Sequence, residues 1–129
     1  MLVKVARGSD YKKGSLYIVY VIEETSFHLK YAVYPVGQLS MPDLEVDPFY
    51  VQAGIFDIVD DRTSQDWVIE ERHIGEKTIK LQSFAEFFSI DGFWYRWNDL
   101  DLVGADYDIV RSYKKKYEEI YADLIALNQ

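Results

Sequence analysis

The sequence predicts an α+β domain, in which a strongly bent antiparallel sheet or small open barrel of about five or six strands precedes the helices. Short segments rich in β-branched and aromatic residues come first, separated by turns that contain Gly, Pro or Asp. The hydrophobic period then changes from two residues to three or four. With 129 residues, 49% of them hydrophobic, the chain can form one core. We therefore expect a single domain over residues 1–129.

The predicted strands are short alternating or fully apolar runs. Residues 16–23 are apolar on both alternating faces, which predicts a central strand covered on both sides. Residues 27–35 alternate and end at Pro35, so the two strands are expected to pair as a hairpin. Gly54 lies inside an apolar run and predicts a bulge or a tight bend. The full set of predicted strands is 1–7, 16–23, 27–35, 49–61, 66–74 and a short last strand at 78–81, with a long surface loop over 36–48.

Helical spacing begins after the last strand. Phe84, Phe87 and Phe88 predict a short aromatic helix, with Ser83 in position to cap its N-terminus. Residues 105–129 predict a C-terminal amphipathic helix. Its apolar stripe is expected to contain Val110, Tyr113, Tyr117, Ile120, Leu124 and Leu127.

An aromatic segment, DGFWYRWNDLD at residues 91–101, lies between the two predicted helices. One helical turn would place Phe93 and Trp97 on the same face, and we expect that face to belong to the core. Trp94 would become an interface anchor if it were exposed on the opposite face.

Acidic residues dominate the net charge of −8 and gather in two blocks. Residues 43–71 contain nine acids and one base, and residues 91–108 contain five acids and one base. Such a field repels nucleic-acid backbone and attracts basic partners. There are no cysteines, no membrane-length apolar run and no apolar leader, so we expect a soluble cytoplasmic protein that does not contact membranes.

No catalytic, cofactor or metal motif is complete, and we expect no cofactor and no metal. His28 and His73 lack a partner at metal-binding spacing. A calcium-like pattern from Asp99 fails because Val110 stands where a bidentate Glu is required. The lysine run at 114–116 is matched by Glu residues three and four positions on, which is typical of a solvated helix face.

The predicted partner-binding surface centres on the acidic turn before the fifth strand. Aromatic and charged side chains together are typical of interface hot spots. The candidates are Asp60, Asp61, Asp66, Trp67 and Glu70, with Asp99 and Asp101 as a second group.

The order of residues 56–70, a short turn, residues 81–101 and a terminal helix resembles small bacterial immunity proteins of polymorphic and contact-dependent toxin systems. Those proteins combine a bent sheet, a strand with a Trp like Trp67, and a wedge like residues 92–94. The resemblance implies a stoichiometric inhibitor that covers the active site of a cognate toxin domain, often a basic nuclease. Two alternatives stay open: an acidic DNA mimic from a phage or mobile element that inhibits a nucleic-acid enzyme, and a hydrolase that uses paired carboxylates.

Overall fold

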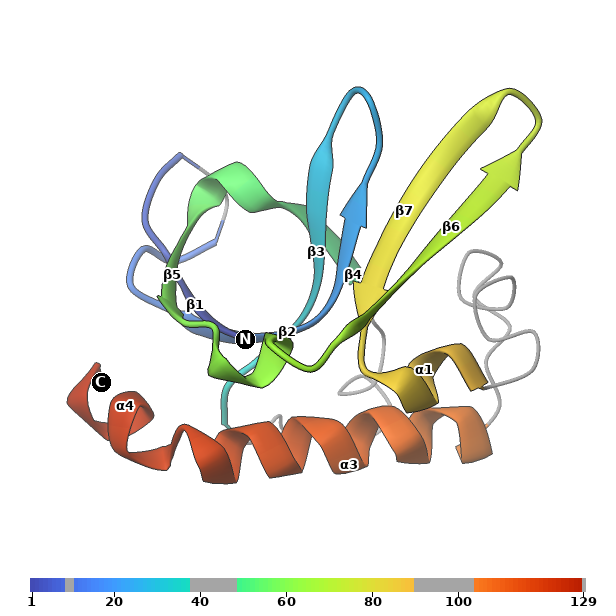
Figure 1. Cartoon of the computed structure of the whole chain (residues 1–129). Helices are drawn as coiled ribbons and strands as arrows, with labels where there is room; N and C mark the ends of the chain where they lie inside the picture. Colours follow the sequence, from blue (N-terminus) through green and yellow to red (C-terminus); the bar gives the residue numbers. More distant parts are fainter. Residues whose placement is uncertain (9–10, 38–48, 90–103, 129) are drawn as a thin grey trace.

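The computed structural model describes residues 1–8, 11–37, 49–89 and 104–128 and has the predicted α+β fold (Figure 1). Within these ranges the sheet contains seven antiparallel strands and is bent but not closed into a barrel. The strands and 3-10 turns are β1 (Leu2–Val5), β2 (Leu16–Glu24), β3 (Leu29–Pro35), β4 (Phe49–Gln52), η1 (Ala53–Ile55), β5 (Phe56–Asp60), η2 (Arg62–Ser64), β6 (Val68–Ile74) and β7 (Lys77–Ser83). The helices are α1 (Ala85–Ser89), α3 (Gly104–Ile120) and α4 (Ala122–Leu127).

Strand β2 is the point at which the sheet branches. Its first half pairs with β1, from Leu16 to Ile18, and its second half pairs with β7, from Val21 to Glu24. A register shift against β3 occurs between Val19 and Val21. A β-bulge of this kind bends a strand and increases its twist. The sheet therefore turns through β2, and its two branches separate beyond the bulge.

The predicted hairpin forms, and the structure contains a second one. Strands β2 and β3 pair along their length, as expected from the sequence. Strands β6 and β7 close through a two-residue turn between Ile74 and Lys77. Gly75 begins this turn with φ of 61°, a left-handed conformation that favours glycine.

The prediction of one continuous strand over 49–61 was wrong. Strand β4 pairs with β3, whereas β5 pairs with β1 at the opposite end of the sheet order. The chain must cross between these two ends, and the 3-10 turn η1 makes the crossing. Gly54 lies inside this turn, so the expected bend is present, but it separates two strands.

Ser83 does not cap the aromatic helix as predicted. It is the last residue of β7 and fully buried, and its hydroxyl donates to the Tyr20 carbonyl at the bulge of β2. Helix α1 begins two residues later, at Ala85. Phe84 stacks on Tyr113 of α3 with ring centroids 3.7 Å apart, so the start of the aromatic helix packs against the terminal helix.

The C-terminal helix is broken at Tyr121, and its buried stripe differs from the predicted one. Figure 1 shows α3 running across one end of the sheet, with α4 continuing beyond the break. Tyr117 and Tyr121 are 4% and 0% exposed, whereas Ile120 and Leu127 are 40% and 79% exposed. The Tyr121 N–H donates to the Tyr117 carbonyl and the Ile125 N–H donates to the Tyr121 carbonyl, so helical spacing continues across the break and the buried stripe steps from Tyr117 to Tyr121.

Candidate functional site

The predicted acidic surface is centred on η2 and its flanking residues. Asp60 ends β5, and its Oδ1 accepts hydrogen bonds from the Arg62 backbone N–H at 2.8 Å and from Arg62 Nε at 3.0 Å. The backbone bond and the guanidinium lower the pKa of Asp60 below its usual value. The Ser64 hydroxyl and N–H both donate to the Asp61 carbonyl. The turn is therefore fixed by its own hydrogen bonds.

A polar network connects this turn to the N-terminus and the C-terminal helices. The Met1 amine donates to Thr63 Oγ1 at 2.7 Å, and Thr63 Oγ1 lies 2.8 Å from the Tyr121 hydroxyl. Tyr121 donates in turn to the Asp60 carbonyl at 3.3 Å. Burial raises the pKa of Tyr121, so its phenol remains a proton donor. The Tyr121 hydroxyl thus connects the junction of α3 and α4 to the turn, and through Thr63 to the N-terminal amine.

The predicted interface residue Trp67 lies in the core. Its side chain is 8% exposed, and its indole N–H donates to the Tyr117 hydroxyl at 3.0 Å. Burial raises the pKa of Tyr117 to about 12. The tryptophan joins the start of β6 to α3 and presents no ring face as an exposed anchor.

Three of the candidate acids, Asp60, Asp61 and Asp66, flank η2, and the others lie elsewhere in the chain. Asp61 and Asp66 are exposed on either side of η2, and no described residue forms an ion pair with them, whereas Asp60 is bonded to Arg62. Glu70 is further along β6 and pairs with Arg72 at 2.6 Å. Asp99 and Asp101 lie outside the described residues, as does the aromatic segment 91–101.

A cleft that the sequence did not reveal lies between the β2–β3 and β6–β7 hairpins, with a volume of about 850 Å³. Figure 1 places the tips of both hairpins at the end of the sheet away from α3, so this cleft is remote from η2. Its lining contains four carboxylates and two ammonium groups, from Glu23, Glu24, Glu71, Glu76, Lys77 and Lys80. Phe27 at its rim is 91% exposed. The sequence feature that could have indicated this cleft is Phe27, which directly follows the turn residues at 24–26. The alternating pattern of residues 27–35 instead placed Phe27 in the predicted strand.

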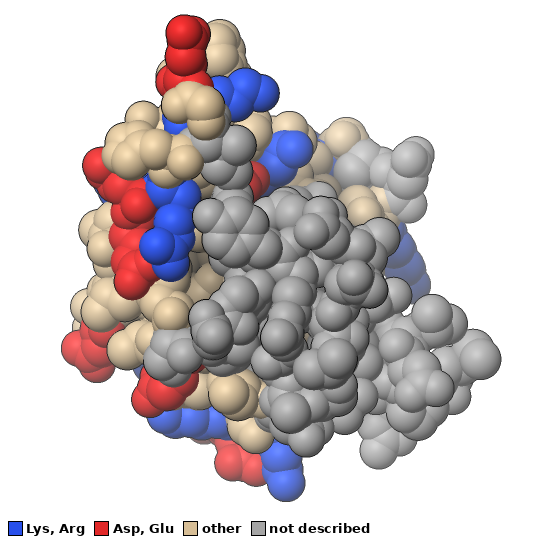
Figure 2. All heavy atoms as spheres, turned by 90° about the vertical axis from the view of Figure 1, so that its right-hand side faces the viewer, with Lys and Arg blue, Asp and Glu red and all other residues tan. Residues whose placement is uncertain are grey.

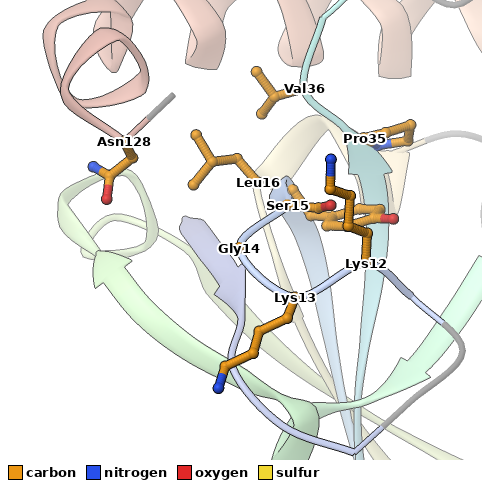
Figure 3. A pocket seen from close by; sticks show the side chains of 9 residues that line it. Lys12, Lys13, Gly14, Ser15, Leu16, Pro35, Val36 and Asn128 are labelled. Carbon is orange, nitrogen blue, oxygen red and sulfur yellow. The ribbon is translucent and has the colours of Figure 1, made fainter.

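A second, smaller pocket of about 440 Å³ opens beside the end of β3 (Figure 3). Leu16, Val36 and Asn128 contribute to its wall together with Lys12 and Lys13. Figure 3 shows the two lysine side chains pointing in different directions, so their charges do not converge on one point. The geometry therefore lacks the converging cations of an anion site.

The histidines and carboxylates of the described residues do not assemble into a metal centre, since no group of three or more of them converges. His28 Nε2 lies 3.3 Å from Glu23, and His73 Nδ1 lies 3.2 Å from the Thr78 hydroxyl.

In Figure 2, acidic and basic groups lie next to one another on the face shown. None of the helices in the described ranges has the length and apolar character that a bilayer crossing requires.

Comparisons with protein-family models, curated proteins and solved structures found no match to this chain.

Proposed function

We propose that the chain is a non-enzymatic binding protein of the immunity type, which neutralises a basic toxin domain in the cytoplasm. The observation that carries the proposal is the pair of exposed carboxylates, Asp61 and Asp66, on a turn that hydrogen bonds to the N-terminus and to Tyr121 hold in place. The Met1, Thr63 and Tyr121 network holds this turn without using either side chain. A partner that meets these carboxylates does not have to order the backbone first, which lowers the entropic cost of binding.

The exposed position of Asp61 and Asp66 favours a role in the electrostatic steering of a basic partner during association. Exposed charges at the edge of an interface act mainly through the association rate, and each exposed pair adds about 1 kcal/mol or less to affinity. A cationic active-site cleft would be drawn toward Asp61 and Asp66, whereas Asp60 and Glu70 are already opposed by Arg62 and Arg72. The absence of cysteine from the sequence is compatible with the reducing cytoplasm in which such a toxin would act.

The described charges give less support to the DNA-mimic alternative. A mimic needs a regular array of negative charge that resembles a phosphate backbone. Here the acids alternate with bases in ion pairs such as Arg7–Asp57, Arg62–Asp60 and Arg72–Glu70. Mixed charge of this kind suits recognition of one protein surface better than mimicry of a polyanion.

The carboxylate-hydrolase alternative also gains little support from Asp60. A general acid at neutral pH requires a raised pKa, because it must keep its proton until the reaction. The hydrogen bonds from Arg62 shift the pKa of Asp60 in the opposite direction. Asp60 therefore has the environment of a structural carboxylate that fixes the turn.

The test is co-expression with the product of the neighbouring gene in a bacterial host. We expect that product to stop growth and this protein to restore it. Asp61→Lys combined with Asp66→Lys should lower protection at least about tenfold, because two attractive contacts become repulsive. A neighbouring product that is harmless, or toxic and unaffected by the native chain, refutes the proposal.

The control is Glu119→Lys, which changes the charge of one exposed residue on α3 away from the turn. This variant should protect as well as the native chain. Both variants should keep the native far-ultraviolet spectrum and unfolding midpoint, because the substituted side chains are exposed. Equal loss of protection in both variants would indicate a general effect of charge and would argue against the turn as the contact.

A further inference from the structure

The cleft between the two hairpins has a free strand edge on one wall. Strand β7 pairs with β2 only as far as the Glu24–Lys80 register position, whereas it pairs with β6 out to Lys77. Residues 77–79 therefore extend past the end of β2 and have β6 as their only strand neighbour among the described residues. Backbone groups alternate sides along an antiparallel strand, so some N–H and C=O groups of this segment face the cleft. A strand from a partner could pair with these groups in the position beside β7 that lies beyond the end of β2.

The opposite wall is a fixed turn that carries an exposed aromatic ring. The Thr25 N–H donates to the His28 carbonyl at 3.0 Å. Thr25 Oγ1 accepts hydrogen bonds from the backbone N–H groups of Phe27 and His28, at 3.3 and 3.2 Å. These bonds hold Phe27 at the rim, where its side chain contributes little to the core. A rigid exposed aromatic ring can bury apolar area on binding at small entropic cost.

The charges of the cleft are unevenly compensated. Glu23 lies 3.3 Å from His28, and Glu24 lies 3.9 Å from Lys80. Across the described residues, no ion pair involves Glu71, Glu76 or Lys77, which leaves two carboxylates against one ammonium group. The lining is thus complementary to a ligand of net positive charge. The volume of about 850 Å³ is within the ordinary range for a peptide or small-molecule site.

We propose that this cleft binds an extended peptide segment of a protein partner, in which arginine or lysine side chains alternate with aliphatic ones. The backbone of the segment adds as a short strand to residues 77–79 of β7. Its cationic side chains meet Glu71 and Glu76, and an aliphatic side chain packs against Phe27. The inference is independent of toxin neutralisation, since the cleft and the η2 turn are at different ends of the sheet (Figure 1).

The experiment is a titration of the full ¹⁵N-labelled chain with three capped pentapeptides, followed by NMR. The peptides alternate valine with arginine, with serine or with glutamate. We expect the arginine peptide to cause saturable shifts at the amides of residues 25–28 and 77–80. The serine peptide should bind several-fold more weakly, and the glutamate peptide should give no saturable shift.

Matched variants separate the two contacts. Glu71→Gln with Glu76→Gln should weaken binding of the arginine peptide about threefold to tenfold, as expected for two exposed ion pairs. Phe27→Ser should weaken all binding in the cleft, whereas Leu127→Ser, at another exposed apolar side chain, should have no effect. Asp61→Asn with Asp66→Asn should leave peptide binding unchanged. Peptide binding in the cleft and toxin neutralisation at the η2 turn can therefore fail independently, and the two proposals are tested separately.

The proposal is overturned by equal binding of the glutamate and arginine peptides, by shifts located outside the cleft, or by no saturable shift up to the solubility limit of the arginine peptide. Unchanged affinity in both the Phe27→Ser and the double glutamine variant would overturn it as well.

Discussion

At the residue scale, two aromatic side chains show why the sequence identified the turn but misplaced its contacts. Trp67 stands among acids in the sequence, and this composition is typical of an interface. Its role is decided by Tyr117, fifty positions away, which supplies the buried acceptor for the indole. Tyr121 was missed for a similar reason, because its hydroxyl is used by Thr63 and Asp60 after the chain has folded. Local patterns cannot report such distant partners.

The buried amine of Met1 predicts a pH dependence of stability. Burial lowers the pKa of this amine from 8.0 to about 5, and the charges of Asp60 and Asp61 oppose the shift only in part. Between these two pH values the unfolded chain binds a proton that the folded chain does not bind. Stability should therefore rise with pH across this window, by at most about 4 kcal/mol. A neutral amine can still donate to both of its acceptors, Val19 and Thr63.

Urea unfolding at several pH values between 5 and 8 measures this dependence. A chain acetylated at Met1 is the control, because it lacks the titrating amine while His28 and His73 are retained. We expect the native chain to gain more stability with rising pH than the acetylated chain gains. Parallel curves for the two chains would show that the amine is not buried in its neutral form.

At the element scale, the sequence identified most of the strands and helices but not the joints between them. The apolar run of β2 and the alternation of β3 predicted a hairpin, and the spacing of Phe84 and Phe87 predicted α1. Periodicity within one segment cannot show that β2 changes neighbours at Tyr20. It also cannot show that the run over 49–61 must divide to reach both ends of the sheet. These joints depend on pairing between strands that are distant in sequence.

Ser83 is the side chain that closes the joint between β2 and β7. Its fully buried hydroxyl donates to the Tyr20 carbonyl at the bulge. Ser83→Ala should lower the free energy of unfolding by about 1–3 kcal/mol, because a buried acceptor loses this donor. It should also speed amide exchange in the β6–β7 hairpin, which is attached to the sheet through β2.

The matched control is Ser26→Ala in the exposed hairpin turn, with an expected change within about 0.5 kcal/mol. Urea unfolding and hydrogen exchange measure the two effects. Equal stability of the two variants would show that the hydroxyl of Ser83 does not hold the branch.

At the scale of the whole molecule, the two surfaces proposed for binding lie at different ends of one sheet (Figure 1). The net charge of −8 indicated a basic partner, but it could not show which acids are free to meet it. Folding pairs Asp57, Asp60 and Glu70 with arginines and leaves Asp61 and Asp66 exposed without a described cation. The cleft at the hairpin tips was beyond sequence reasoning, since three strands and two turns contribute to it.

The most direct test of the central claim is the association rate constant for the purified product of the neighbouring gene, measured at several salt concentrations. We expect Asp61→Asn with Asp66→Asn to lower this rate constant about threefold to tenfold at low salt and to reduce its dependence on salt. The dissociation rate constant should change little, because exposed edge charges act mainly on encounter. The same association rate and the same salt dependence in native and double-variant chains would contradict the claim that this turn receives a basic partner.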